Sequence, residues 1–275
     1  MKTFLITGAS TGIGEACAEH LAGLGHTVYA GVRKASDAER LGAIDGVTPL
    51  ILDVTDAAQI EAAIKTIGAE GGLDGLVNNA GIAVGGPIEY LPLDMWQRQF
   101  DVNVFGQIAM TQAALPFLRA STGRVVFMGS IGGKVATQLI APYNASKFAI
   151  EAIGESLRHE LKPWGMRVSV IEPGAVKTPI WNKAESSADE LTRDLPAEAL
   201  TTYAEHISAL RKSFSMQMKQ GVEPIKVAQA VEHALLSRRP KTRYPVGIDA
   251  RAMSAMVRLT PDKPREALVR RIAGP

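Results

Sequence analysis

Short apolar runs recur along the chain, and longer amphipathic stretches separate them. Glycine, asparagine and aspartate flank most runs, a rhythm typical of successive β-α-β units. Residues 124–128 and 168–171 are almost uniformly apolar, as expected for parallel strands buried on both faces. The pattern predicts strands at residues 2–7, 27–32, 48–52, 74–78, 124–128, 167–172 and 243–246. With helices in most gaps, this is an α/β fold, a doubly wound parallel sheet of about seven strands with helices on both faces.

The chain reads as one domain. Its 275 residues are 46% hydrophobic, which suffices for the core of one large α/β domain. No internal repeat, low-complexity tract or interdomain linker interrupts the pattern. We therefore predict a single domain over residues 1–275.

Two segments depart from the rhythm. The polar segment at about 178–221 is too long for a simple connection, and we interpret it as a substrate lid. A surface excursion without function is the competing interpretation. The C-terminal tail at about 249–275 predicts a basic amphipathic helix from Arg251 and a shorter helix after Pro261. The apolar residues of the lid segment are Ile180, Trp181, Leu191, Leu195, Leu200, Tyr203, Ile207, Leu210, Phe214 and Met216.

Composition and charge exclude several classes of function. The net charge is only +2, from 30 basic and 28 acidic residues, so the sequence does not support binding to nucleic acid. No apolar run reaches the roughly 18 residues of a transmembrane helix. The five histidines lack partners at metal-ligand spacing, so no metal site is expected. One cysteine, Cys17, and an N-terminus that enters a strand directly predict a cytoplasmic protein.

A glycine-rich turn connects the first strand to a helix predicted from about Ile13 to Leu24. The turn reads Thr-Gly-Ala-Ser-Thr-Gly-Ile-Gly and places Gly8, Gly12 and Gly14 where the strand becomes a helix. Glycines let backbone amides approach a pyrophosphate closely, and the helix N-terminus adds unpaired N–H groups. Alone, such a turn is weak evidence for binding, because tight turns also use glycine for positive φ.

Tyr143 and Lys147 stand four residues apart in a segment that reads as a helix, so both side chains emerge on one face. A free phenol titrates near pH ~10 and is a poor acid or base at neutrality. A nearby ammonium favours the phenolate, so we expect Lys147 to lower the pKa of Tyr143 and make it usable for proton transfer. An ordinary surface pair is the alternative.

The combination of motifs resembles the short-chain dehydrogenase/reductase family. The glycine spacing Gly-x-x-x-Gly-x-Gly and the Tyr-x-x-x-Lys pair carry the resemblance. In the expected order between them stand Asn-Asn-Ala-Gly at 78–81, Asn103 and Ser130, and Pro173-Gly174 follows. The likeness runs from Lys2 to about Gly247 and implies a Rossmann-type fold. Residues 144–149 and 168–174 look like the branch that acts on retinol and steroids.

The resemblance implies a role for each residue. Tyr143 would exchange a proton with the substrate oxygen, Lys147 would assist it, Ser130 would orient the substrate, and Asn103 would hold a water for proton relay. Strand capping is the alternative for Ser130, and a local backbone contact is the alternative for Asn103. The cofactor would contact Gly8, Ser10, Gly12, Ile13, Gly14, Arg33, Asp53, Val54, Asn79, Gly81, Tyr143, Lys147, Pro173, Gly174, Val176 and Thr178.

The end of the second strand indicates which nicotinamide cofactor is used. An acid at this position would receive the ribose hydroxyls of NAD, but Val32 stands there and Arg33 follows. A guanidinium suits a 2′-phosphate, so we predict NADP, with NAD as the alternative. Thr11 occupies the place where many NADP-using relatives carry a basic residue. Asp53 would contact the adenine or cap the helix that follows.

The resemblance implies an alcohol and carbonyl oxidoreductase, acting by hydride transfer on a small-molecule substrate. A lipophilic alcohol or ketone would suit the lid, and a 3-oxoacyl reductase is the nearest enzymatic alternative. A protein that binds NADP as a sensor or scaffold is the alternative from another class. The resemblance also implies a homodimer or homotetramer. For the tail, packing over the cleft, a subunit contact and adhesion to an anionic membrane compete.

Overall fold

The computed structural model describes residues 1–180 and 196–273. Seven parallel strands form one sheet in the order β3-β2-β1-β4-β5-β6-β7. All seven predicted strands are present, and their ends differ from the predicted ones by at most one residue. The strands are β1 (Thr3–Ile6), β2 (Thr27–Val32), β3 (Val47–Ile51), β4 (Gly75–Asn78), β5 (Arg124–Met128), β6 (Arg167–Pro173) and β7 (Arg243–Val246).

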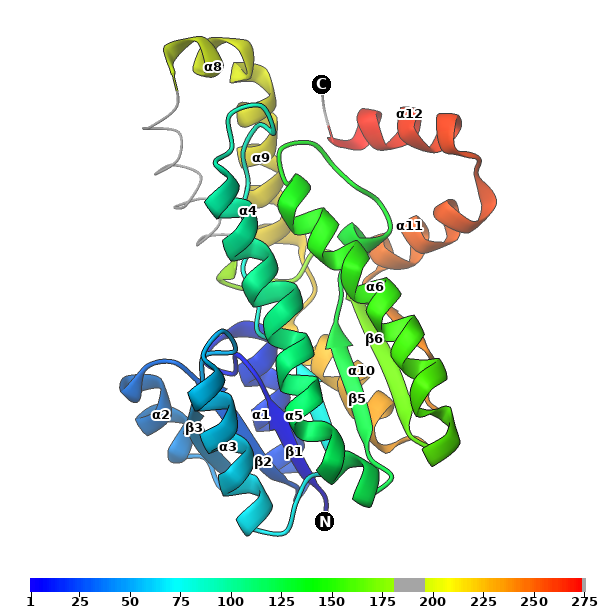
Figure 1. Ribbon diagram of the computed structural model, residues 1–275. Coiled ribbons are helices and arrows are strands. Elements are labelled where there is room, and N and C mark those ends of the chain that lie inside the picture. The colour runs from blue at the N-terminus through cyan, green and yellow to red at the C-terminus, as the bar shows by residue number, and fades with distance from the viewer. Residues whose placement is uncertain (181–195, 274–275) are drawn as a thin grey trace.

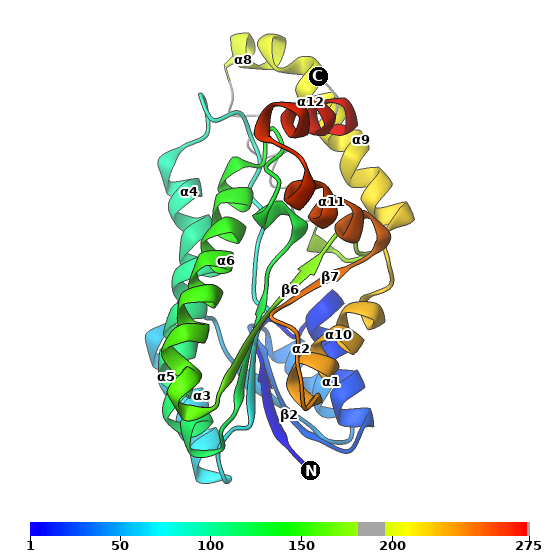
Figure 2. The ribbon, with the colours of Figure 1, turned by 90° about the vertical axis from the view of Figure 1, so that its right-hand side faces the viewer.

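Helices cover both faces of the sheet, as Figure 2 shows. One face carries α1 (Gly12–Gly23), α2 (Ala35–Gly42) and α10 (Pro224–Leu236). The other carries α3 (Ala57–Ala69), α5 (Gly106–Ala120) and α6 (Ala141–Leu161). Helix α4 (Leu93–Phe100) continues into α5 through a π-helical turn, Asp101–Phe105. Short 3₁₀ turns occupy Ile131–Gly133 and Lys162–Trp164. The predicted doubly wound fold is confirmed.

Alternation along each strand feeds two separate cores. In β1, Phe4 and Ile6 belong to the cluster packed on α1 and α10, whereas Leu5 belongs to the cluster packed on α3, α5 and α6. Successive side chains of a strand point to opposite faces, so a strand covered on both sides must be apolar at every position. This explains the uninterrupted apolar runs. The sheet is therefore held rigidly between two layers of helices.

The strand order reverses between β1 and β4, where successive connections leave on opposite faces of the sheet. The buried hydroxyl of Thr7, just after β1, accepts hydrogen bonds from the backbone N–H groups of Asn79 (3.0 Å) and Ala80 (3.0 Å), just after β4. One side chain thus fixes the two turns that leave this point. Ligands of doubly wound sheets bind beside such a reversal.

The segments beyond the carboxyl ends of the strands are helical (Figure 1). They comprise α8 (Ala197–Thr202), α9 (Ala204–Gln220), α11 (Ile248–Leu259) and α12 (Asp262–Ala273). The described part of the predicted lid contains α8 and α9, and Trp181, Leu191 and Leu195 lie outside the described residues. In the tail, α12 is as long as α11, at 12 residues each, so the expected shorter helix was wrong. Within the described ranges, no helix is long and apolar enough to cross a membrane.

The Thr7 hydroxyl offers a test of the link between β1 and β4. Thr7→Ala leaves two buried N–H groups without their acceptor, so we expect the free energy of unfolding to fall by about 2–5 kcal/mol. Thr7→Ser keeps the oxygen and should lose only about 1 kcal/mol for the missing methyl group. Urea unfolding of the three proteins measures both values. An equal loss in the two variants would contradict the proposed role of the hydroxyl.

Candidate active site

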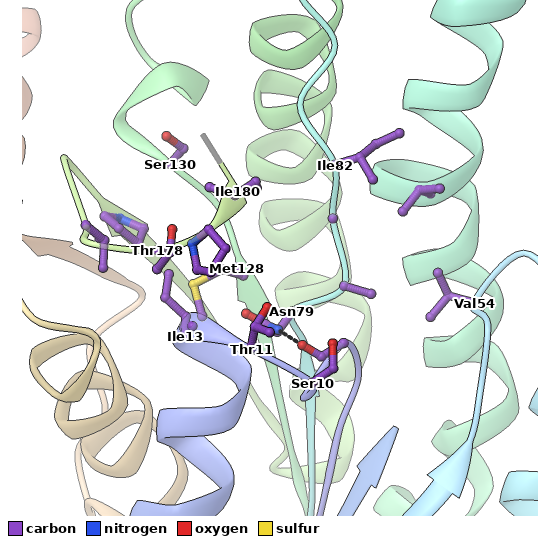
Figure 3. Close-up of a pocket in the computed structure, with 18 of the residues that line it drawn as sticks. Ser10, Thr11, Ile13, Val54, Asn79, Ile82, Met128, Ser130, Thr178 and Ile180 are labelled. Atoms are coloured by element: carbon purple, nitrogen blue, oxygen red, sulfur yellow. Dashed lines mark hydrogen bonds between the residues drawn. The ribbon is translucent and has the colours of Figure 1, made fainter. Parts of the chain in front are cut away.

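A cavity opens beyond the carboxyl ends of the strands, around the reversal point. Figure 3 shows Ser10 and Thr11 at its lower end and Ser130 and Ile180 at its upper end. The cavity is lined by Gly8, Ser10, Thr11, Gly12, Ile13, Val32, Arg33, Leu52, Asp53, Val54, Asn79, Ala80, Gly81, Ile82, Val102, Met128, Gly129, Ser130, Tyr143, Lys147, Pro173, Gly174, Val176, Thr178, Pro179 and Ile180. Most of the predicted site residues therefore surround one space.

The glycine turn needs glycine at two positions because its backbone is left-handed there. Gly8 and Gly12 both have φ of +64°, and a Cβ on Gly8 would stand 2.8 Å from the Cα of Ala80. Helix α1 begins after Thr11, whose side chain makes no capping hydrogen bond. The first amides of α1 therefore lack a side-chain acceptor at the cavity, which suits an anion such as a pyrophosphate.

Gly14 does not line the cavity. A Cβ at this position would stand 2.4 Å from the Gly8 carbonyl oxygen and 2.5 Å from Nδ2 of Asn79. Gly14 thus allows α1 to pack closely against the turn. The Asn79 amide fixes the same turn by donating to the carbonyls of Thr7 (2.9 Å) and Gly8 (3.0 Å), the second of which is drawn in Figure 3.

Tyr143 lies in the first turn of α6 and is buried, with 7% of its surface exposed. Burial raises the pKa of its phenol, and a hydrogen bond with Ser130 opposes this rise. The expected lowering of this pKa by Lys147 was wrong, because desolvation dominates. The phenol is neutral at neutral pH, so it holds a proton that it can donate.

Lys147 is also buried, and desolvation lowers its pKa to about 8. Its Nζ donates to the carbonyl of Met128 (2.7 Å) and lies 5.6 Å from the centre of the Tyr143 ring. The helical spacing therefore brings the two side chains to one cavity, as the pattern predicted. A carbonyl oxygen of β5 thus fixes the position of the ammonium beside the Tyr143 ring.

Ser130 follows β5, and its hydroxyl accepts from the backbone N–H of Gly132 (3.0 Å), which caps the 3₁₀ turn. The predicted alternative of strand capping is therefore corrected to a helix cap. Asn103 is fully buried in the π-helical turn and does not line the cavity. Its side chain accepts from the N–H of Ile82 (2.9 Å) and donates to the Ile82 carbonyl (3.0 Å). Asn103 thus fixes the chain that forms one cavity wall.

Arg33 and Asp53 meet at the open end of the cavity. The guanidinium of Arg33 is 66% exposed and lies 3.7 Å from the Asp53 carboxylate. Burial raises the pKa of Asp53, but hydrogen bonds from Thr55 and the charge of Arg33 outweigh it and lower the pKa overall. Asp53 accepts from the N–H (3.0 Å) and hydroxyl (2.8 Å) of Thr55, whereas Asp56 caps α3. Of the two roles considered for Asp53, the alternative of capping this helix was therefore wrong.

A second arginine reaches the glycine turn from α2. Arg40 donates to the carbonyl of Ser10 (2.6 Å) and forms an ion pair with Glu15 in the first turn of α1. The sequence analysis missed it, because Arg40 lies 30 residues from Ser10 along the chain. Its charge is already opposed by a carboxylate, whereas Arg33 has its partner only at 3.7 Å.

Asp249 was also missed, although it fixes the turn that contains Gly174. This turn leaves β6, and its residues Pro173, Gly174, Val176 and Thr178 line the cavity. Asp249, in the first turn of α11, accepts from the N–H of Ala175 (2.7 Å). A Cβ on Gly174 would stand 2.1 Å from the Asp249 carboxylate, so glycine is required for this contact. Helix α11 thereby holds one wall of the cavity.

An apolar cluster adjoins the cavity at Tyr143 and Ile180. Ala83, Ile140 and Tyr143 form a small buried cluster, against which Ile180 and Leu210 pack. Ile180 precedes the undescribed segment, and Leu210 belongs to α9, so the described part of the predicted lid contacts the aromatic ring of Tyr143. The region next to the phenol therefore presents hydrocarbon.

Several residues that line the cavity were not among the predicted site residues, and most of them are apolar or glycine. Several missed residues stand next to a predicted one, as Val32 does beside Arg33 and Gly129 beside Ser130, so the flanking positions were the available signal. The missed lining residues are Thr11, Val32, Leu52, Ala80, Ile82, Val102, Met128, Gly129, Pro179 and Ile180. Within the described ranges, no group of three or more His, Cys, Asp or Glu is placed to hold a metal ion.

Comparison with known proteins identifies a family to which this chain is similar. The profile of a family described as short chain dehydrogenase matches residues 2–189. The chain is 35% identical to the NADPH-dependent 3-dehydrocapnine reductase of Ornithobacterium rhinotracheale, covering 96% of this chain and 94% of the relative. It is 37% identical to retinol dehydrogenase 5 of Mus musculus, covering 90% and 81%. A short-chain dehydrogenase/reductase from Burkholderia phymatum, solved in complex with NAD, matches with a TM-score of 0.79 and 26% identity over 94% and 92%.

Burial of Lys147 predicts a pH-dependent stability. Its folded-state pKa of about 8 lies below the ordinary value of 10.5. Between these values the unfolded chain holds a proton that the folded chain lacks, so raising the pH through this window favours folding. We expect wild type to gain about 3 kcal/mol relative to Lys147→Met between pH ~8 and ~10.5. Urea unfolding at several pH values measures this difference. A difference that stays constant with pH would contradict a buried, desolvated ammonium.

Proposed function

The chain belongs to the short-chain dehydrogenase/reductase family, and we propose that it reduces the carbonyl group of a lipophilic substrate with NADPH. Like its relatives, it is an NAD(P)-dependent oxidoreductase of alcohol and carbonyl groups. One observation carries the finer proposal: the ring of Tyr143 lines the cavity beside the glycine turn and also belongs to an apolar cluster with Ile180 and Leu210. A proton donor thus lies at the border between a dinucleotide site and a hydrocarbon surface.

The residues present fit a dinucleotide. Gly8 and Gly12 bring the backbone close to the cavity, and the α1 amides after Thr11 have no side-chain acceptor. These groups would hold the pyrophosphate. Arg33 would bind the 2′-phosphate of NADP, in agreement with a relative that is named NADPH-dependent. Asp53 and Val54 would flank the adenine, and Asn79, Gly81, Pro173, Gly174, Val176 and Thr178 would shape the remaining walls.

The bound cofactor supplies a hydride to the carbonyl carbon, and side chains of the protein stabilise and protonate the carbonyl oxygen. As the carbonyl oxygen becomes negative, Ser130 stabilises it by hydrogen bonding, and Tyr143 donates its phenolic proton to complete the alcohol. The burial that raises the pKa of Tyr143 keeps this proton in place at neutral pH. Lys147 then favours the phenolate left behind, until solvent returns a proton. In the family, this lysine also holds ribose hydroxyls of the nicotinamide.

Asn103 acts indirectly in this proposal. Its side-chain amide is engaged with the backbone of Ile82 and donates to the hydroxyl of Ser146 (3.2 Å) in α6. The side chain thus connects the cavity wall to the helix that carries Tyr143 and Lys147. The relay water that the family resemblance implies would have to use another atom of Asn103, such as its backbone carbonyl.

An apolar substrate fits the cavity better than a strongly polar one. Ala83, Ile140, Ile180 and Leu210 offer hydrocarbon beside the phenol. Burial of apolar area stabilises a complex by about 25 cal/mol per Å² before the cost of ordering. The likeness to retinol dehydrogenase 5 supports a steroid- or retinoid-like compound. A 3-oxoacyl substrate is the second enzymatic candidate.

Assembly and location complete the proposal. We place the protein in the cytoplasm, as its single cysteine and N-terminal sequence indicate, and expect a homodimer or homotetramer, as the family resemblance implies. Cys17 is buried, and burial raises the pKa of its thiol to about 12, which leaves it unreactive. A sensor or scaffold that binds NADP without turnover remains the non-enzymatic alternative, which the next experiment tests.

Replacing Tyr143 tests the proposed chemistry. We expect Tyr143→Phe to lower kcat by about 10²–10⁴-fold, because the proton donor is lost while the apolar ring stays. NADPH binding, followed by nucleotide fluorescence, should change little. The assay compares steroid and retinoid carbonyls with 3-oxoacyl thioesters. Preference for the thioesters would contradict the substrate class, and no turnover of any carbonyl by wild type would favour the sensor.

Cofactor choice depends on Arg33 in this proposal. In Arg33→Ala, the ratio of kcat/KM for NADPH to that for NADH should fall by roughly tenfold or more, because an ion pair with the 2′-phosphate is lost. Arg40→Gln is the matched control, since Arg40 is close to the turn but paired with Glu15. If the ratio changed in Arg40→Gln and stayed constant in Arg33→Ala, Arg40 and not Arg33 would select the cofactor, and the proposal would be wrong.

A further inference from the structure

Helix α11 has apolar side chains on two opposite faces. Its inner face, which includes Ala250 (0% exposed) and Ser254 (6%), packs against the protein. On the opposite face, Ile248 is 86% exposed and Leu259 is 81% exposed. A helix that serves only to pack against its own domain needs one apolar face, so the second face calls for another partner.

The exposed face forms a continuous stripe. Ile248, Ala252, Ala255 and Leu259 are all exposed and stand at positions i, i+4, i+7 and i+11, which share one side of an α-helix. The stripe is about 16 Å long at the rise of an α-helix. We call these four residues the α11 stripe.

Cations accompany the stripe. Arg251 and Arg258 are exposed along one flank, and no ion-pair partner occurs for either within the described part of the chain. Exposed Lys263, Arg270 and Arg271 follow on α12. Residues 248–273 carry six basic and three acidic side chains, whereas the whole chain has a net charge of only +2. These two helices therefore carry a local excess of positive charge beside the exposed stripe.

A second copy of the chain is a poor occupant of the stripe. Two stripes facing each other would bring Arg251 and Arg258 of both copies together. Asp249, the only carboxylate of α11, is occupied by the N–H of Ala175 (2.7 Å). Hydrocarbon flanked by unopposed cations instead complements a lipid surface with anionic headgroups. We propose that the α11 stripe, with Arg251 and Arg258, docks this protein on an anionic membrane surface.

The docking site is connected to the active site through the tail. Helix α12 packs against α9 (Figure 2). Leu210 of α9 packs against the buried cluster that includes Tyr143. A membrane on this side would place the described part of the lid near the lipid, where lipophilic carbonyl compounds dissolve. This delivery of substrate rests on the proposed function, but docking itself does not.

Vesicle co-sedimentation of the full-length protein tests the proposal. Vesicles of phosphatidylcholine are compared with vesicles that contain about a third phosphatidylserine. We expect much tighter binding to the anionic vesicles. Arg251→Gln/Arg258→Gln should weaken it by roughly twentyfold, because each cation near an anionic surface contributes about fivefold. Ile248→Ser/Leu259→Ser should weaken it by about tenfold or more through loss of buried hydrocarbon.

Matched controls separate the stripe from general charge and hydrophobicity. Arg238→Gln/Arg239→Gln removes two exposed cations from the loop before β7, and Leu24→Ser removes a half-exposed leucine after α1. Both should bind vesicles like wild type. Equal effects of control and stripe variants, or no preference for anionic vesicles, would overturn the proposal. A dimer in size-exclusion chromatography that only the stripe variants dissociate would overturn it in favour of a subunit contact.

Activity toward a water-soluble ketone is measured in parallel. The two double variants should retain the wild-type kcat/KM, because none of the four substituted residues lines the cavity. These residues are Ile248, Arg251, Arg258 and Leu259. Vesicle binding without turnover of any carbonyl would refute the proposed function and still support docking. Turnover with no vesicle binding would refute docking and leave the proposed function intact.

Discussion

The architecture of the site depends on the pairing of β1 with β4. These strands are neighbours in the sheet but lie about 70 residues apart in sequence, as the separation of 72 between Thr7 and Asn79 shows. The Thr7 hydroxyl holds the glycine turn and the Asn79 turn at a fixed spacing, and the Asn79 amide returns two hydrogen bonds. Because the order of strands reverses here, the next connections diverge to opposite faces and leave a cleft between them.

The fold was predictable because its signals are local. A strand covered on both faces must be apolar throughout, and the run from Arg124 to Met128 shows this without any knowledge of its neighbours. The glycine turn was predictable for the same reason, since Gly8 and Gly12 adopt a left-handed backbone conformation that other residues avoid. Helical spacing alone placed Tyr143 and Lys147 on one face. Each of these inferences needs only a few consecutive residues.

The remaining features of the site depend on contacts between residues that are far apart in the sequence, which a local sequence pattern does not reveal. Arg40 reaches Ser10, Asp249 reaches Ala175, and Lys147 reaches Met128 through contacts between separate elements. The expected lowering of the pKa of Tyr143 did not occur, because burial of the phenol dominates. The sequence places an ammonium one helical turn from the phenol, but it does not say which oxygen the ammonium binds or how deeply both groups are buried.

Burial of Tyr143 connects the chemistry to substrate choice. Ile180 and Leu210 pack against the buried cluster that includes Tyr143, and in the proposed function an apolar substrate would contact the same hydrocarbon. Desolvation raises the cost of the phenolate, so in the proposed reaction it would keep the proton on Tyr143 until a carbonyl oxygen beside it becomes negative. A polar residue in place of Leu210 would therefore affect two properties together, because it would admit water to the phenol and weaken an apolar ligand. In the proposed function, acid strength and substrate specificity would therefore depend on the same desolvation.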